Sequence, residues 1–150
     1  MIYVDSISQA LFTAIASDAA IVNSGTTVWL ERERNTDAGF TPWIGVYYVG
    51  TQIEPKRANV SAPFEARHTF RLECQAFNGV DLLAARMQSY QVLWQVLTAV
   101  NTARASTGVV LGGAVDMFMD AQVNQPDTVP NTDGGGFSTV EANLMFEQRA

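Results

Sequence analysis

The stretch RHTFRLECQA, residues 67–76, decides the fold, and the run DLLAARMQSYQVLWQVLTAV, residues 81–100, follows it almost at once. In the first stretch apolar and polar side chains alternate, with Phe70, Leu72 and Cys74 on the apolar side. A period of two residues is typical of a β-strand with one covered face. The second run has apolar residues at helical spacing. Together they predict a sheet with a long helix packed on it.

This helix has clear signals for its start and for its length. Asn78 and Asp81 precede it as candidate caps, and the apolar rhythm continues to about Asn101. At about 1.5 Å per residue, such a helix is on the order of 30 Å long, which is enough to cover a sheet. We expect its large apolar side chains to face the sheet: Leu83, Met87, Tyr90, Leu93, Trp94, Leu97 and Val100.

The remaining segments follow from the same criteria. They are a helix capped by Asp5 or Ser6, a short turn at 19–22 capped by Asp18, and strands at 27–32, 42–49, 115–123 and 139–149. We expect a long loop or extended arm at about 50–65, and turns throughout 124–136. The order α-β-β-β-α-β-β predicts a single α+β domain over residues 1–150. It is a two-layer sandwich, with a mostly antiparallel sheet and two main helices on one face.

The composition excludes several classes of protein. Of the 150 residues 47% are hydrophobic but only 16% are charged, and the net charge is −6. An acidic balance argues against a protein that grips nucleic-acid phosphates. We find no apolar run long enough to cross a membrane and no signal peptide, so we expect no membrane partner and folding in the cytoplasm. The low charge content indicates buried contacts between subunits.

The residues that could carry chemistry do not form an active site. The one histidine, His68, lies on the apolar side of its strand, so a packed histidine is the better interpretation. Cys74, the one cysteine, is expected to be a small buried side chain. Asp116 and Asp120 are about 13 Å apart on a strand, too far to share a metal ion. We therefore predict no enzyme activity, no cofactor and no metal.

Two groups of charged residues are candidates for contacts between subunits. The first is the alternating cluster Glu31, Arg32, Glu33 and Arg34, and the second is the pair Lys56 and Arg57 in the expected arm. In a ring, each subunit can offer a carboxylate to an arginine of its neighbour. Both groups have an equally simple alternative as solvated charges at the tip of a strand or loop.

A third candidate surface is the sheet face away from the helices. Its polar positions include Asp116, Asp120 and Glu141, and acids outnumber bases among the charged residues there. Such a face is either plain solvent surface or the lining of an aqueous channel. A mildly acidic lining would let DNA pass without binding it.

The layout resembles that of the tail terminator, or tail completion, proteins of long-tailed bacteriophages. The resemblance covers nearly the whole chain. It includes the first helix with SDAAIVN after it, the strands PWIGVYYV and HTFRLECQAF, the long helix, and two closing strands. It rests on this pattern, and no site residue is assigned through a motif.

The resemblance implies a structural virion protein. Such proteins form a homo-oligomeric ring, usually a hexamer, at the head-proximal end of the tail tube. The ring ends tube polymerisation and offers the joining surface for the head, so the tail tube protein and the neck or head-completion connector are the expected partners. DNA passes through without specific binding, and assembly takes place in the host cytoplasm.

Two other functions remain open from the sequence. One is another neck or head-completion protein that bridges portal and tail. The other, of a different class, is a cytoplasmic domain that binds a small ligand in a pocket lined by Trp43, Tyr47, Tyr48 and Trp94. Aromatic residues at these spacings are more often part of a core.

Overall fold

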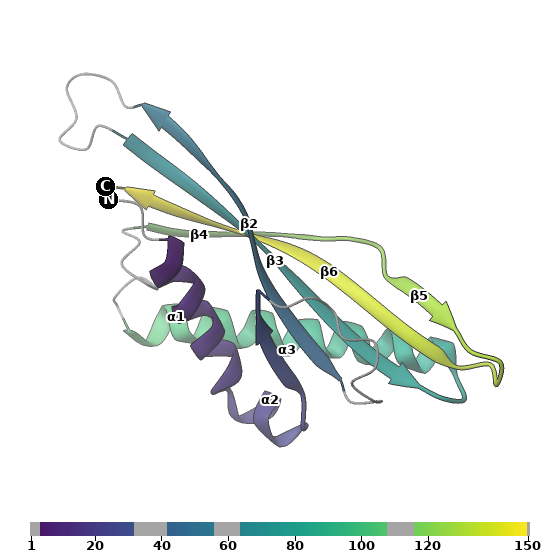
Figure 1. The fold of residues 1–150 in the computed structure, drawn as a ribbon. Helices are drawn as coiled ribbons and strands as arrows, with labels where there is room; N and C mark the ends of the chain where they lie inside the picture. Colours follow the sequence, from purple (N-terminus) through teal and green to yellow (C-terminus); the bar gives the residue numbers. More distant parts are fainter. Residues whose placement is uncertain (1–3, 32–41, 56–63, 108–115, 150) are drawn as a thin grey trace.

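The fold is an α+β sandwich of two layers (Figure 1). The computed structural model describes residues 4–31, 42–55, 64–107 and 116–149. Its strands are β1 (Thr27–Leu30), β2 (Trp43–Pro55), β3 (Phe64–Asn78), β4 (Asp116–Val123), β5 (Asp127–Pro130) and β6 (Gly136–Arg149). Its helices are α1 (Val4–Ala16), α2 (Ala19–Asn23) and α3 (Leu82–Thr107). The predicted fold class is confirmed, with α2 and β5 as additions to the expected order.

The sheet has the strand order β1-β2-β3-β6-β4, and β5 pairs with β6 beside this path. β3 and β6 are paired along almost their whole length, from Glu65 with Arg149 to Asn78 with Gly136. β4 and β5 pair with successive parts of the other edge of β6. Only β1 and β2 are parallel among the pairs described, so the sheet is mostly antiparallel, as expected.

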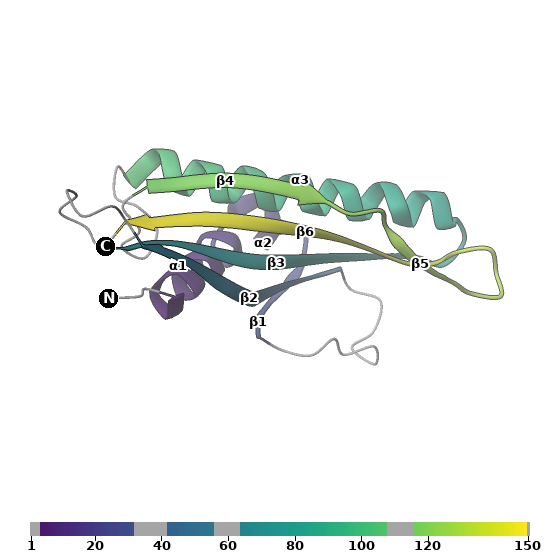
Figure 2. The ribbon, with the colours of Figure 1, turned by 90° about the horizontal axis from the view of Figure 1, so that it is seen from above.

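Both long helices cover one face of this sheet. α3 runs along β3 and β6, and α1 lies against β1 and β2 and also touches α3 (Figure 2). The core between the two layers consists of even-numbered strand residues and of helix residues that face them. Its largest fully buried side chains include Ile7, Leu11, Ile15, Ile44, Phe70, Leu72, Leu144 and Phe146.

Two of the predicted helix caps, Asp18 and Asp81, are confirmed. Asp5 and Ser6, the candidate caps of the first helix, instead lie inside α1 (Val4–Ala16). The Asp18 carboxylate accepts a hydrogen bond from the Ile21 amide at 3.3 Å, at the start of α2. Asn78 Oδ1 accepts from the amides of Val80 (3.0 Å) and Asp81 (2.9 Å), and Asp81 Oδ1 accepts from Leu83 N at 3.0 Å. Asp18 and Asp81 take up amide groups that the first turns of α2 and α3 leave free, so these two helices begin where the sequence indicates. The two amides that Asn78 binds lie before Leu82, so Asn78 forms a turn ahead of α3.

The buried side of α3 differs from the expected one. The side chains that face the sheet are the smaller ones: Ala85, Ser89, Val92, Leu93, Val96, Ala99 and Val100. Leu83, Met87, Tyr90 and Trp94 are exposed instead, and Trp94 keeps 73% of its surface. Small residues let the helix axis approach the sheet closely, and Ser89 Oγ reaches Ser138 Oγ on β6 at 3.1 Å. The prediction of a large apolar stripe against the sheet was therefore wrong, apart from Leu93, Val100 and the partly buried Leu97.

The expected loops also contain more strand than predicted. β2 continues to Pro55 and β3 begins at Phe64, so the ends of the segment 50–65 form a projecting antiparallel hairpin (Figure 1). The rest of that segment, 56–63, lies outside the described residues. Within 124–136, β5 pairs with β6, and Asn131 Oδ1 accepts hydrogen bonds from Asp133 N and Gly135 N at 3.0 Å. Strand thus replaces the predicted turn at 127–130, while 124–126 and the tip of this second hairpin at 131–135 contain no strand.

Candidate functional site

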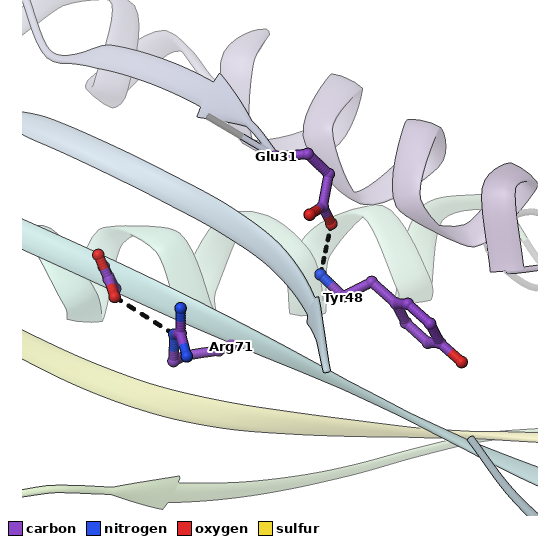
Figure 3. A network of polar contacts seen from close by, with 4 residues as sticks. Glu31, Tyr48 and Arg71 are labelled. Carbon is purple, nitrogen blue, oxygen red and sulfur yellow. Dashed lines mark hydrogen bonds and ion pairs between the residues drawn. The ribbon is translucent and has the colours of Figure 1, made fainter. Parts of the chain in front are cut away.

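The sheet face opposite the helices, here called the open face, carries the first candidate site. Arg71 on β3 lies over the ring of Tyr47 on β2, with the guanidinium carbon 4.9 Å from the ring centre. Arg71 Nε also lies 3.2 Å from Glu73 Oε1, an ion pair drawn in Figure 3. Because the Glu73 side chain is only 13% exposed, this pair is better shielded from water than an ordinary surface pair. The ring and the carboxylate together hold the arginine flat on the sheet.

Glu141, a predicted channel-facing residue, lies on the open face. It is the partner of Glu73 in the β3–β6 pair, and partners directly across two strands share a face. Glu141 is half-buried. Two carboxylates directly opposite each other repel, and the Arg71 guanidinium beside Glu73 offsets part of that repulsion. The open face therefore has an acidic pair near its middle.

The other two predicted channel-facing residues are placed by their backbone alone. Asp116 pairs with Glu147 and Asp120 with Met145, both on β6, and the register shifts between these two pairs. Their side chains lie outside the part of the chain that is described in atomic detail. The assignment of Asp116, Asp120 and Glu141 to a channel stays a prediction.

Aromatic residues cover the β1 end of the open face. Trp29 and Trp43 stack with ring centres 5.7 Å apart, and Trp43 Nε1 donates a hydrogen bond to Gln75 Oε1. Trp94 lies on α3, on the far side of the sheet, and Tyr48 packs against Phe70 on the helix side. Trp43 and Tyr47 lie together over Gly45 on the open face, whereas Tyr48 and Trp94 lie on the other side of the sheet, so the four aromatic side chains proposed for a ligand pocket cannot line one pocket. The ligand-pocket alternative is wrong in this form.

A second candidate site, here called the acidic groove, lies between the start of α1, the end of β1 and β2. It has a volume of about 310 Å³ and is lined by Val4, Asp5, Ser8, Gln9, Leu30, Glu31 and Tyr48. The charged side chains among these are both acids. Further along β2, Ile53 is about half exposed and pairs with Ala66, so it lies on the same sheet face as Tyr48, and Val49 is an exposed residue of the bulge between them.

Glu31 is held in the acidic groove by a tight backbone turn. Its φ of +54° is unusual for a residue with a side chain. Glu31 N donates to Val46 O at 2.9 Å, and a Glu31 carboxylate oxygen accepts from the Tyr48 amide (Figure 3). These bonds fix the carboxylate although the residue is exposed. The other subunit-interface candidates, Arg32, Glu33, Arg34, Lys56 and Arg57, lie outside the described residues.

The two residues with reactive side chains are both buried, as predicted. His68 has no exposed surface, and its Nδ1 lies 2.8 Å from Thr51 Oγ1. Cys74 is a free, fully buried thiol. Burial raises the pKa of the Cys74 thiol far above its ordinary value, and the neighbouring Glu73 carboxylate adds to this. A thiol kept in its neutral form is inert as a nucleophile.

Several features of these sites have no signal in the sequence. The contact of Arg71 with Tyr47 and the Trp29–Trp43 stack depend on strand register, which only pairing sets.

Within the described residues, no three acidic, histidine or cysteine side chains are placed to hold a metal ion. Likewise, no helix in the described part of the chain is both long and apolar enough to span a membrane.

The fold and these surfaces define an α+β sandwich that exposes a polar sheet face, an acidic groove and an apolar helix face. No protein-family model matches the chain, and no curated protein does. Among solved structures, the chain is similar to a chain in the virion of a native gene transfer agent particle. That match has a TM-score of 0.56 and 14% identity, and covers 99% of this chain and 98% of the other. The chain is also similar to the gp17 protein of bacteriophage SPP1, with a TM-score of 0.52 and 11% identity, over 97% of this chain and 92% of the other. At such identities the matches show a shared fold.

Proposed function

We propose that this chain is a structural protein of a tailed phage or a phage-like particle. The observation that carries the proposal is the fold shared, end to end, with a component of a gene transfer agent virion and with a bacteriophage protein. Partial matches often reflect a common motif, whereas these cover nearly the whole of both chains. The layout of the sequence, which resembles tail terminator proteins, supports the same class independently of the structure.

Within the particle, we propose a ring at the head-proximal end of the tail tube, most simply a hexamer. The ring ends polymerisation of the tail tube protein and joins the tail to the neck connector. A chain with only 16% charged residues and a large exposed apolar helix face is suited to contacts with other subunits. The same properties would also suit another neck protein, and the position of the protein in the particle separates the two.

The open face is the proposed lining of the ring's bore. Glu73 and Glu141 lie opposite each other on it, and the chain has a net charge of −6. A lining with an acidic excess repels the phosphates of passing DNA, so that the DNA moves without adhering. The proposed role of Asp116, Asp120 and Glu141 is this repulsion.

The test of the function is to image particles made without the gene for this chain. We expect overlong tails or tails that carry no head, and restoration of normal particles when the gene is supplied in trans. A gold-labelled copy should appear at the head-proximal end of purified tails. Label at the portal with normal tail length would indicate a neck protein, and an absence of label from all particles would refute the proposal.

The bore is tested separately by reversing the charge of its proposed lining. In the variant Asp116→Lys, Asp120→Lys, Glu141→Lys, we expect normal tail length but slowed or failed DNA passage, because the cations attract phosphate. The matched control adds the same six units of positive charge at exposed helix positions away from the open face: Thr13→Lys, Ala19→Lys, Asn23→Lys, Gln88→Lys, Asn101→Lys and Thr102→Lys. Equal infectivity of the two variants would mean that the open face does not line the bore.

A further inference from the structure

The exposed side of α3 has a regular apolar pattern. Its members Leu83, Met87, Tyr90 and Trp94, here called the α3 stripe, have 61%, 58%, 43% and 73% of their surface exposed. Their separations of four, three and four residues repeat every seven, a spacing that keeps all of them on one side of a helix. Val80, in the turn before α3, is also 80% exposed. Scattered surface hydrophobic residues do not show such order.

The α3 stripe has the size and composition of an interface. Together with Val80, its side chains expose on the order of 600 Å², given the surface areas of large apolar residues and the exposed fractions above. A stable complex buries about 800 Å² of surface on each partner. Within 82–103, where side chains are described, Arg86 is the only charged residue of α3. Low charge at the centre of an exposed surface is typical of a protein contact.

A second surface of the same chain complements the α3 stripe. The acidic groove contains the carboxylates of Asp5 and Glu31, and beside it Tyr48, Val49 and Ile53 are 37%, 55% and 48% exposed. Arg86 is exposed and lies one helical turn from both Leu83 and Tyr90. The α3 stripe therefore combines apolar side chains with one cation, and the acidic groove with the adjoining β2 residues combines apolar side chains with two anions.

The two surfaces cannot meet within one molecule. The α3 stripe lies in the N-terminal half of α3, and the projecting β2–β3 hairpin lies at the other end of the molecule in both views (Figures 1 and 2). Complementary surfaces at different ends of a subunit produce head-to-tail contacts, which form a ring when the rotation between copies closes and a filament when it does not.

We propose that the α3 stripe of one copy of this chain docks on the acidic groove and the adjoining β2 surface of a second copy. Trp94 and Tyr90 provide the apolar anchors, and Arg86 faces Asp5 and Glu31 of the next copy. The contact itself rests on these two surfaces, whereas its closure into a ring at a tail end rests on the proposed function.

The first test is sedimentation of the purified chain over a range of concentrations. We expect the wild type to associate, and Met87→Glu with Trp94→Glu to raise the dissociation constant by at least about 30-fold, the effect of losing one anchor residue. The control, Gln88→Glu with Thr102→Glu, adds the same charge to exposed positions of α3 outside the stripe and should associate normally. Circular dichroism should show all three proteins folded. A wild type that stays monomeric at its highest soluble concentration, or unchanged association of Met87→Glu with Trp94→Glu, would overturn the contact.

The second test identifies the surface that covers the stripe. Gln91→Cys lies among the stripe residues and Ile53→Cys lies on β2, while the native Cys74 is buried and does not compete. Under mild oxidation, we expect disulfide-linked dimers when the two single variants are mixed. Efficient dimers from Gln91→Cys alone would mean that two α3 helices meet, and would overturn the assignment of the groove.

Imaging of tails made with Met87→Glu, Trp94→Glu separates this inference from the proposed function. We expect uncapped, overlong tails. Normal tails from the variant would overturn the ring contact and leave the role in the particle intact. A wild type that associates as described but is absent from tails would refute the proposed function and leave the contact standing.

Discussion

The pH dependence of unfolding provides a direct test of the environment of Cys74. In the folded chain, burial raises the pKa of this thiol, with a further contribution from Glu73. In the unfolded chain the thiol is in water and has its ordinary pKa of about 8.5. Because the folded pKa is the higher one, the unfolded state loses its proton first as the pH rises. The stability that the group contributes is therefore complete below about pH 8 and decreases above it.

The magnitude follows from linkage. Each pH unit above the unfolded pKa costs about 1.4 kcal/mol, so the loss at about pH 10 is about 2 kcal/mol. The perturbation that isolates it is Cys74→Ala, which we expect to cost about 1 kcal/mol at neutral pH as a small truncation in the core. At about pH 10 the variant should be the more stable protein by about 1 kcal/mol, since it has no thiol to ionise.

Urea unfolding of both proteins at several pH values between about 7 and 10 measures this difference, and other groups that titrate in this range cancel in it. A thiol reagent should label the native protein slowly at neutral pH and rapidly in urea. Parallel stability curves for the two proteins across this range would refute the reasoning, because they would mean that Cys74 ionises equally in both states.

Three further predictions concern packing, capping and the arm. Phe70 is fully buried with its ring 5.6 Å from that of Phe146, so Phe70→Ala should cost about 3–5 kcal/mol in urea unfolding; less than about 1 kcal/mol would mean that the core is placed wrongly. Asp18→Ala removes the cap of α2 and should cost about 1 kcal/mol, whereas Asp18→Asn should largely retain stability. Lys56→Glu with Arg57→Glu should change the melting temperature very little but produce overlong or headless tails, and normal tails would exclude the arm as an assembly element.

The elements with a strong periodic signal could be predicted from the sequence. The alternation around Leu72 indicates β3 and its buried side, and Asn78 and Asp81 mark the start of α3. These signals are local, since they depend on neighbouring residues in the chain. β5 was missed because its four residues end in proline and its only signal is its pairing with β6.

The orientation of α3 could not be predicted from periodicity. The helix has two apolar sides, one with small residues such as Ala85 and Ala99 and one with large residues such as Trp94. Hydrophobicity alone favours burial of the large side. Close packing on the sheet favours the small one, and only the neighbouring strands decide between them. Prediction of the candidate sites is limited in the same way. The charge of Glu31 marks it as a candidate in the sequence, but the groove around it is formed by three elements that are distant in sequence, so the groove itself could not be predicted.

The position of β6 in the sheet has a consequence for the order in which the chain folds. β6 contains residues 136–149, yet it lies inside the sheet, with β3 on one side and β4 and β5 on the other. During synthesis, β1, β2 and β3 can pair and α1 can pack against them, but β3 keeps a bare edge until β6 has emerged from the ribosome. Pairing partners so far apart in sequence make this closure the slow step. Until then the exposed edge of β3 can pair with another chain, so we expect incomplete chains to aggregate and not to enter an assembly.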